Sequence, residues 1–348
     1  MTAIRKVIAI LTAAMRRREF TIGLLLAATS RPVRGQEPAR QHRIAIVIST
    51  GSVDDINDNG SRVWRAFFEA LRRQGDIERQ NLTVERHSGE GRPERLGDVA
   101  REVVSRNPDV ILAIGPLVSL AVTAVTDTIP IVTTGTRPSP GVLPSLARPG
   151  GNLTGARVEL GSEIFGKRLQ ILKETIPSAS KVAYLEIRSF WESVSGQEVR
   201  EQLRQASRLL QISLTDLLVE ESTPSEYQGA FAEITRDPPD AILVGSTSEL
   251  FPYRQLIVEL AEQHRLPGMY CWRDYVEAGG LMAYGTDLVE IWRRLADDVH
   301  EILNGAKPGE IPIYQPTKFE FLINLKAAKV LGLTIPPSLL ALANEVIE

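Results

Sequence analysis

The chain has 348 residues, of which 24% are charged and 43% hydrophobic, and its formal net charge is −3. This length is sufficient for two domains with their own cores, and no apolar run reaches the roughly 18 residues that are needed to cross a bilayer. The single cysteine, Cys271, excludes an internal disulfide, and we expect its side chain to be buried in packing.

The first 35 residues have the layout of a bacterial signal peptide. Three arginines at 16–18 precede a short apolar run at 22–28, and small residues follow up to Gly35. We expect export by the Sec or the twin-arginine route, cleavage near Gly35 and Met15 as the natural start. Removing residues 1–35 takes away seven basic residues and one acidic residue, so the net charge falls from −3 to −9. We therefore expect no nucleic-acid partner.

Strands and helices alternate through the first half of the mature chain. Apolar residues recur with helical spacing from Trp64 to Leu71, and Gly75 ends that helix as a C-cap. The segment 109–114 is apolar throughout, as is typical of a parallel strand buried on both faces. The other expected strands are 43–49, 83–86 and 129–133, and the other expected helices are 96–105 and 118–125.

The second half continues the alternation. A turn and an extended crossing segment at 150–155 lead to a helix over 163–175, which Pro177 stops. The expected strands then begin at Lys181 and lie at 213–219, 241–245, 268–272 and 279–285, with helices at 195–210, 227–236 and 253–264. A long amphipathic helix over 287–303, a strand at 318–323 and a helix at 325–331 complete the chain.

Three strand-like phrases of the first half return in the second half in the same order. RIAIVIST at 43–50 is echoed by KVAYLEIR at 181–188, and the phrases at 108–115 and 129–135 are echoed at 239–245 and 266–272. The similar offsets indicate two α/β lobes of one plan, each with a parallel, doubly wound sheet. Ligands of such sheets bind beyond the carboxyl ends of the strands. Two such lobes leave a cleft between their strand ends. We therefore predict that the lobes clamp a small molecule in this cleft.

The residues that follow the expected strands are therefore the candidate ligand-binding residues. Serine, threonine and glycine at helix starts expose backbone N–H groups that suit a carboxylate, and the aromatic residues suit an apolar or aromatic ligand body. The candidates are Ser49, Thr50, Gly115, Pro116, Thr134, Gly135, Thr136, Arg137, Arg188, Ser189, Phe190, Trp191, Ser246, Thr247, Trp272, Tyr284 and Asp287.

Alternative interpretations exist for several of these residues. The hydroxyl residues are also typical helix N-caps and turn residues. Arg137 and Arg188 suit a carboxylate clamp and equally suit a solvated rim. Asp287 suits either an ammonium group or the N-cap of the helix that follows it. The four histidines have no metal-ligand spacing, and neither a G-x-S-x-G motif nor a P-loop is present, so we expect no metal, no cofactor and no catalytic site.

Three segments resemble one family. LARPGGNLTG at 146–155, YGTD at 284–287 and the phrase at 315–348 are similar to the TrpX-like family of ABC transporter substrate-binding proteins. The resemblance implies a type I periplasmic binding fold with three crossovers between the lobes, and ligands that include aromatic amino acids. It implies lobe one at 42–155 plus 285–307, and lobe two at 156–284 plus 308–348.

The chain departs from many relatives at two places in the expected cleft. It has Arg137-Pro138 where they have Asp-Pro, and it has 187–191 where they have an Asn-Pro-like turn. We therefore do not assign the ligand of these relatives to this chain, because Arg137 favours a ligand with an extra negative group or one bound in the opposite sense.

We expect a monomeric periplasmic protein that closes on a small carboxylate-bearing ligand, such as an amino acid or aromatic acid, and delivers it to an inner-membrane ABC permease. One alternative is a sensor that presents its closed form to a receptor kinase, and another is a periplasmic enzyme that uses the cleft. A LacI-like regulator has a similar core, but the signal peptide and the lack of a basic DNA-reading segment argue against it.

Overall fold

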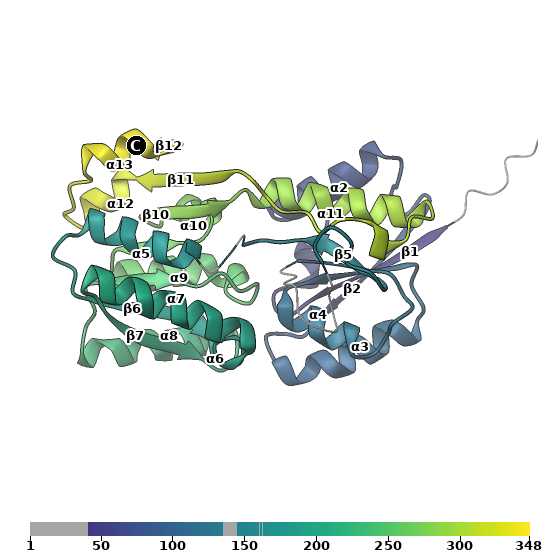
Figure 1. The fold of residues 1–348 in the computed structure, drawn as a ribbon, viewed down its shortest axis with the longest axis horizontal. Helices are drawn as coiled ribbons and strands as arrows, with labels where there is room; N and C mark the ends of the chain where they lie inside the picture. Colours follow the sequence, from purple (N-terminus) through teal and green to yellow (C-terminus); the bar gives the residue numbers. More distant parts are fainter. Residues whose placement is uncertain (1–40, 135–144, 160, 162) are drawn as a thin grey trace, which may run out of the picture. The chain divides into compact units, whose positions relative to one another are not determined.

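Twelve strands among the described residues form two sheets. The computed structural model describes residues 41–134, 145–159, 161 and 163–348, and 42–348 belong to one unit (Figure 1). The strands are β1 (His42–Ile48), β2 (Leu82–Ser88), β3 (Val110–Ile114), β4 (Ile131–Thr134), β5 (Leu153–Ala156), β6 (Lys181–Ile187), β7 (Ser213–Val219), β8 (Ala241–Val244), β9 (Gly268–Tyr270), β10 (Met282–Thr286), β11 (Phe319–Asn324) and β12 (Glu345–Ile347).

Helices connect most of these strands and cover the sheets. They are α2 (Arg62–Arg73), α3 (Leu96–Ser105), α4 (Pro116–Thr123), α5 (Glu163–Thr175), α6 (Arg188–Glu192), α7 (Val194–Leu210), α8 (Pro224–Glu233), α9 (Arg254–Gln263), α10 (Arg273–Glu277), α11 (Leu288–Leu303), α12 (Leu325–Val330) and α13 (Pro337–Leu342).

The first sheet has five parallel strands in the order β2-β1-β3-β4-β5. Its centre is apolar because helices cover both faces, and all five residues of β3 are buried. Strand β5 forms one edge of this sheet. The sequence analysis predicted an extended crossing segment there and did not assign it to the sheet. We call this sheet with α2, α3, α4 and α11 the first lobe.

The second sheet has seven strands in the order β12-β11-β10-β9-β8-β6-β7. Its strands from β7 to β10 are parallel, which confirms the predicted α/β fold class. Strand β11 runs antiparallel to β10, however, so this sheet is not wholly parallel as we predicted. The reversal follows from the path of the chain, which leaves the sheet after β10 and re-enters it from α11. We call this sheet with the remaining helices the second lobe.

Helix α11 packs on the first lobe although β10 and β11, which flank it in the sequence, belong to the second (Figure 1). It packs against α2 and contacts β3, β4 and β5. The chain therefore passes between the lobes three times: after β5, after β10 and before β11. The exact residue boundaries of the lobes stay a prediction.

Helix α2 shows how the sequence pattern produces the packing. Its apolar residues recur every three or four positions, and Trp64, Phe67 and Leu71 are buried on one face. Gly75 follows the helix with a φ of +92°, a conformation that glycine adopts without strain, and its N–H bonds to the carbonyl oxygen of Arg72 at 3.1 Å. The predicted end of this helix is therefore confirmed.

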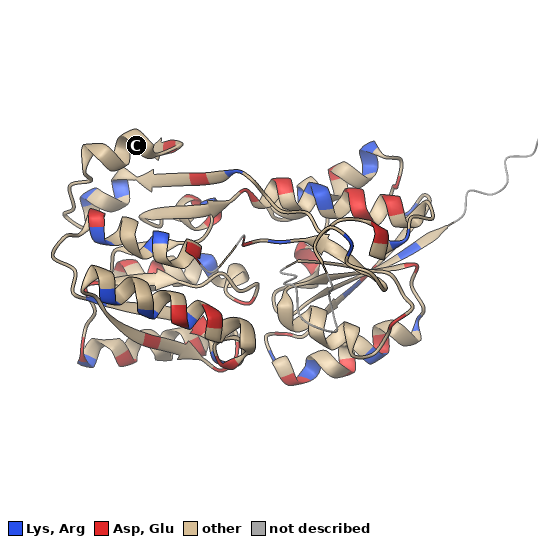
Figure 2. Cartoon of the chain, viewed as in Figure 1, with Lys and Arg blue, Asp and Glu red and all other residues tan. Residues whose placement is uncertain are grey.

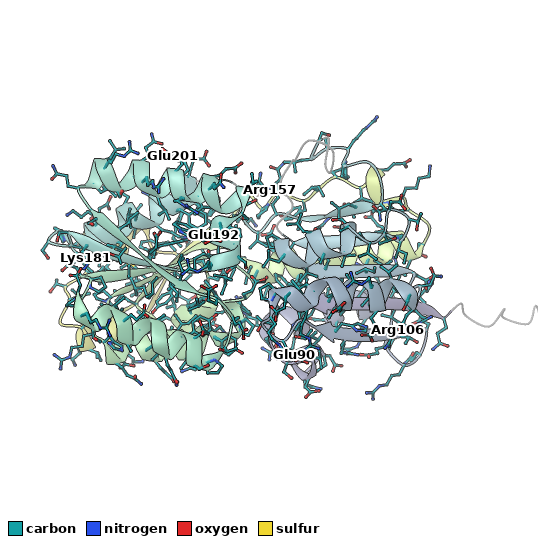
Figure 3. All side chains as sticks on the ribbon, turned by 90° about the horizontal axis from the view of Figure 1, so that it is seen from below. Glu90, Arg106, Arg157, Lys181, Glu192 and Glu201 are labelled. Atoms are coloured by element: carbon teal, nitrogen blue, oxygen red, sulfur yellow. The ribbon has the colours of Figure 1, made fainter. Side chains whose placement is uncertain are left out.

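Charged residues of both signs lie on the helices around both sheets (Figure 2). Figure 3 labels Glu90 and Arg106 on the first lobe and Lys181, Glu192 and Glu201 on the second. Several such residues form exposed ion pairs, including Arg106 with Glu102 at 2.5 Å. Exposed pairs of this kind contribute only about 0–1 kcal/mol each. The stability of the fold therefore comes mainly from its buried apolar residues, among them Cys271, whose predicted burial is confirmed.

Candidate functional site

A cavity of about 370 Å³ is lined by residues from both lobes. Its volume lies in the range of roughly 300–1,000 Å³ that is typical of small-molecule pockets. The walls come largely from residues that follow strands at their carboxyl ends and from the helices that begin there. This is the place where ligands bind to open α/β sheets.

The first lobe contributes hydroxyl groups and glycine at the ends of β1, β3 and β4. Ser49 and Thr50 follow β1, Gly115 and Pro116 follow β3, and Thr134 is the last residue of β4. The Gly115 N–H donates to Thr134 Oγ1 at 2.8 Å, so this hydroxyl fixes the start of α4. These five predicted residues therefore lie together at the cavity.

The second lobe contributes Phe190 from α6, the loop Ser246–Thr247–Ser248 after β8, and Trp272 after β9. Four predicted residues, Phe190, Ser246, Thr247 and Trp272, are thus brought to the same cavity. Trp272 is 4% exposed and packs edge-on against Phe251, with 5.7 Å between the ring centroids. Phe190, Phe251 and Trp272 therefore make this side of the cavity aromatic.

Aromatic rings form much of the wall of the cavity. Trp64 of α2 and Trp292 of α11 meet edge-on with their centroids 6.1 Å apart. The aromatic lining residues are Trp64, Phe165, Phe190, Phe251, Trp272 and Trp292. Rings of this kind bury large apolar areas and favour stacked or edge-on partners. The cavity therefore suits a ligand with a flat, apolar body.

Charged residues occupy specific parts of the lining. Arg157 and Glu159 follow β5, and Glu159 Oε1 accepts a hydrogen bond from Arg168 Nη2 at 2.9 Å. Arg254 lies over the Phe251 ring, 4.8 Å from its centroid. Asp55 also lines the cavity but is exposed. The site thus combines an apolar wall with a few placed charges, as ligand pockets usually do.

The two lobes contact one another beside the cavity. The hydroxyl groups of Ser49 and Ser248 are 3.4 Å apart, and the Ser222 N–H donates to the Gly91 carbonyl oxygen at 3.1 Å. The ideal Cβ position at Gly115 lies 2.1 Å from Ser248 Oγ and 3.1 Å from Ser248 Cβ, so any larger residue at 115 would push Ser248 away. The structure therefore has the lobes in contact around the cavity.

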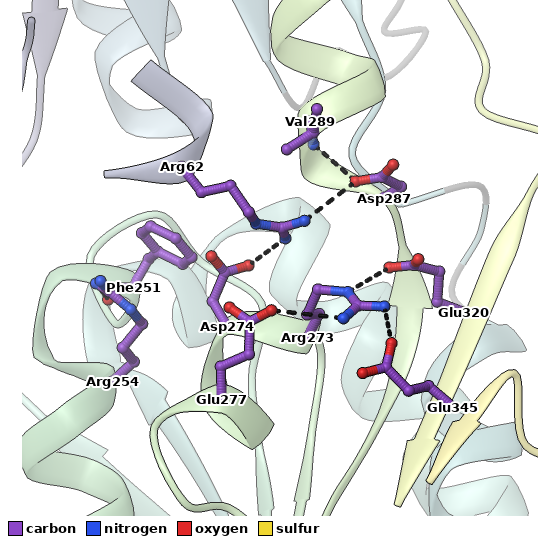
Figure 4. A network of polar contacts seen from close by, with 10 residues as sticks. All are labelled: Arg62, Phe251, Arg254, Arg273, Asp274, Glu277, Asp287, Val289, Glu320 and Glu345. Atoms are coloured by element: carbon purple, nitrogen blue, oxygen red, sulfur yellow. Dashed lines mark hydrogen bonds and ion pairs between the residues drawn. The ribbon is translucent and has the colours of Figure 1, made fainter. Parts of the chain in front are cut away.

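Arg62 connects the lobes at another point (Figure 4). Its guanidinium, on α2, is 3.0 Å from Asp274 of α10 and 3.8 Å from Asp287, the residue before α11. Neighbouring Arg273 pairs within the second lobe with Glu277, Glu320 and Glu345 (Figure 4). Arg62 thus ties the first lobe to the second next to one of the chain crossings.

Two buried carboxyl groups lie behind the second-lobe wall. Glu186 is fully buried on β6 and accepts hydrogen bonds from Thr247 Oγ1 at 2.6 Å and from the Ile187 N–H at 2.9 Å. Burial raises the pKa of Glu186 to about 8 and also raises the pKa of Glu249, whose Oε2 accepts from Ser248 Oγ at 3.1 Å. At neutral pH, Glu186 is therefore mainly the uncharged acid.

We expect the raised pKa of Glu186 to make the protein less stable as the pH rises. The folded value is about 8 and the ordinary value 4.5, so the group contributes stability below about pH 4.5 that is lost as the pH rises through 8. Glu186→Gln, which mimics the uncharged acid, should unfold like the unsubstituted protein at pH 5. At pH 9 its free energy of unfolding in urea should be higher by on the order of 1–3 kcal/mol.

Glu192→Gln, on the exposed side of α6, is the matched control and should show no such gain. A Glu186→Gln variant whose stability relative to the unsubstituted protein is the same at both pH values would contradict this assignment.

Three predicted residues near the end of β6 lie outside the cavity lining. We expected these residues at the cavity because they follow the strand, but 188–192 form helix α6, in which successive side chains point about 100° apart. Phe190 therefore faces the cavity, whereas Trp191 packs against Tyr184 and donates from Nε1 to Asp216 at 3.0 Å. Arg188 pairs with Glu220 and Glu192. Ser189 does not line the cavity either.

Tyr284 and Asp287 have structural partners instead of a place in the lining. The Tyr284 ring stacks on Phe319 of the neighbouring strand, with 5.6 Å between centroids. Asp287 accepts from the Val289 N–H at 2.9 Å, which confirms the N-cap alternative. Three further candidates, Gly135, Thr136 and Arg137, lie outside the described residues.

Several lining residues were missed by the sequence analysis. Glu159 and Arg157 follow β5, and the rule of inspecting strand ends would have found them if 153–156 had been recognised as a strand. Trp64, Phe165 and Trp292 lie on helices, where their spacing predicts only burial in the core. No sequence signal distinguishes a helical tryptophan that faces a cavity from one that faces a core.

No group of three or more histidine, cysteine, aspartate or glutamate side chains in the part of the chain that the structure describes could hold a metal ion. Of the helices in the same described residues, none combines the length and the apolar character that a membrane span requires.

Comparison with known proteins agrees with this geometry. A family model described as "ABC transporter substrate binding protein" matches residues 54–347. The "Tyrosine-binding protein" of Clostridioides difficile is 23% identical over 271 residues, which cover 77% of this chain and 76% of that protein.

Two solved structures show the same fold. A conserved domain protein from Vibrio cholerae has a TM-score of 0.76 at 24% identity, and covers 88% of this chain and 100% of its own. An ABC domain from Streptococcus pneumoniae in complex with L-Trp has a TM-score of 0.73 at 20% identity, with the same coverage. Both support the predicted type I periplasmic binding fold of two α/β lobes.

Proposed function

The chain belongs to the family of ABC transporter substrate-binding proteins, as its resemblance predicted, and from this premise we propose that it binds an amino acid with an aromatic side chain in the cavity between its lobes. The observation that carries the proposal is the lining itself. It joins hydroxyl groups and the start of α4 on the first lobe with aromatic rings from both lobes.

The two parts of the lining suit the two parts of such a ligand. Ser49 and Thr50 offer hydroxyl donors to a carboxylate, and the positive N-terminal end of α4 favours a negative charge. Phe190, Trp272 and the other rings offer an apolar surface to an aromatic side chain. Of the predicted candidates, we keep the nine that line the cavity as proposed ligand-binding residues.

The relatives support the class of ligand. One relative is named for tyrosine binding, and one neighbour in structure was solved in complex with L-Trp. The aromatic lining of this chain's cavity favours the same class of ligand. The volume of about 370 Å³ also fits a ligand of this size.

We further propose that binding is coupled to closure of the lobes. The three chain crossings provide a hinge, and the contacts of Ser49 with Ser248 and of Gly91 with Ser222 belong to the closed form. A ligand that contacts both lobes stabilises this form over an open one.

The family implies where the protein works. Substrate-binding proteins of ABC transporters are typically extracytoplasmic, and we propose that this chain is exported by its N-terminal segment to the periplasm. There it would act as a monomer, deliver an unmodified ligand to an inner-membrane ABC permease and support import.

Calorimetric titration of ligand-free protein tests the proposal. We expect an aromatic amino acid, L-tryptophan or L-tyrosine, to bind with a Kd of ~1 μM or lower, which corresponds to about −8 kcal/mol. Aliphatic amino acids of similar charge should bind at least about tenfold more weakly, because they leave the rings uncovered.

Sugars serve as the comparison class in the same titration, since other binding proteins of related fold were solved with 5-methylthioribose and myo-inositol. Binding of a sugar without binding of any aromatic amino acid would contradict the proposal. Mass spectrometry of the ligand after incubation should recover it unchanged, whereas a converted product would indicate an enzyme.

A further inference from the structure

Four lining residues carry a buried polar atom that has no hydrogen-bond partner among the described residues. The atoms are Thr50 Oγ1, Trp272 Nε1, Trp292 Nε1 and Glu159 Oε2. Buried polar groups are nearly always paired, so unpaired ones in a cavity wall indicate where a ligand supplies the partner. The hydroxyl and the two indole N–H groups can donate, whereas an ionised carboxylate can only accept. The complementary ligand therefore has acceptors and at least one donor.

Glu159 is held in place by a residue that does not itself line the cavity. Arg168 on α5 is fully buried and donates from Nη2 to Glu159 Oε1 at 2.9 Å. The same guanidinium donates from Nε to the Tyr284 carbonyl oxygen at 2.7 Å and from Nη2 to the Cys271 carbonyl oxygen at 3.4 Å. Because these bonds fix the guanidinium, they also fix the carboxylate, whose side chain is only 12% exposed.

This arrangement uses one carboxylate oxygen and leaves the other buried without a partner among the described residues. A hydrogen bond between a cationic donor and a buried carboxylate is stronger than one between neutral groups. A primary ammonium group is the cationic donor that an amino acid carries, and a deaminated acid of the same shape lacks it.

We propose that Glu159 Oε2 accepts a hydrogen bond from the ammonium group of the ligand and thereby selects amino acids over the corresponding deaminated acids. Arg168 acts as a positioning residue for Glu159. The inference rests on the proposed function, because it assigns a role within the same cavity.

The other lining carboxylate has a different environment. Asp55 is exposed, and its Oδ1 already accepts a hydrogen bond from the Ser61 N–H at 2.8 Å. Water screens a charge in such a position, so its effect on the ligand is small. Asp55→Asn therefore removes the same charge from the lining as Glu159→Gln without removing the proposed contact.

The experiment compares L-tryptophan with indole-3-propionate, which has the ring and the carboxylate but no ammonium group. Calorimetric titration of the unsubstituted protein should give a Kd for L-tryptophan at least about tenfold lower than that for indole-3-propionate. In Glu159→Gln this ratio should fall to within about threefold of one, with the Kd for indole-3-propionate nearly unchanged. Asp55→Asn should keep the ratio.

Two results would overturn the inference while leaving the proposed function intact. In the first, Glu159→Gln keeps the full preference for L-tryptophan. In the second, it weakens the binding of both probes equally, which would indicate a structural role. If the unsubstituted protein binds neither probe and no other aromatic amino acid, the proposed function fails and the inference fails with it. If Glu159→Gln does not fold, the double variant Glu159→Met/Arg168→Met is used instead, because it removes both charges together. Its Kd values for the two probes are compared in the same way.

Discussion

Gly115→Ala is expected to weaken binding of an aromatic amino acid by about tenfold to a hundredfold, because it prevents the closest approach of the lobes. The ideal Cβ at Gly115 lies 2.1 Å from Ser248 Oγ and 3.1 Å from Ser248 Cβ. Ser248 belongs to the other lobe, so the clash opposes the closed form. Calorimetric titration with L-tryptophan measures the loss.

The conformation of Gly115 calls for a matched control, since its φ of +100° is strained for any other residue. Gly75 has a φ of +92° and no atom within 4 Å of its ideal Cβ, so Gly75→Ala introduces the same kind of backbone strain without a clash. This control should bind like the unsubstituted protein. Adding Ser248→Gly to Gly115→Ala should restore most of the affinity.

A Gly115→Ala variant with full affinity, or one that Ser248→Gly does not rescue, would show that contact between these two residues is not part of the form that binds ligand. Equal losses in Gly75→Ala and Gly115→Ala would assign the effect to backbone strain in the first lobe.

Arg168→Met is expected to lower the free energy of unfolding by about 3–5 kcal/mol, because breaking a buried ion pair leaves the other charge without compensation. Arg168 is fully buried, and its guanidinium connects α5 to the ends of β9 and β10 and to Glu159. Methionine keeps much of the volume but none of the donors. Urea unfolding at neutral pH measures the change.

Lys167→Met changes the preceding residue of the same helix, where the side chain is exposed, and should alter stability by less than about 0.5 kcal/mol. Combining Arg168→Met with Glu159→Met should recover part of the loss, since the two residues are coupled. If Arg168→Met unfolds at the same urea concentration as Lys167→Met, the guanidinium does not stabilise the fold as we describe.

Much of the fold follows from the sequence. The three repeated phrases predicted the two lobes. The apolar strands and the helical spacing from Trp64 to Leu71 predicted individual elements, because a strand buried on both faces and a helix buried on one face have different patterns of apolar residues. The antiparallel pairing of β11, the edge strand β12 and helix α13 were not predicted. These elements are short and depend on where the chain returns after α11, which no local pattern records.

The sequence predicted the part of the candidate site that is built from residues at the ends of strands. Ser49, Gly115 and Thr247 lie at the cavity because the carboxyl ends of parallel strands meet at one edge of a sheet. Trp191 was predicted from its place after a strand, but it lies in helix α6, which turns its ring away from Phe190. Helical residues such as Trp292 line the cavity because of tertiary packing, which could not be predicted from the sequence.

The crystal structure of the protein with a bound aromatic amino acid tests the central claim most directly. We expect electron density for the ligand in the cavity between the lobes, with its ring against Trp272 and Phe190 and its polar end near Thr50 and Glu159. Density for the ligand at any other place, with this cavity free of it, would contradict the account.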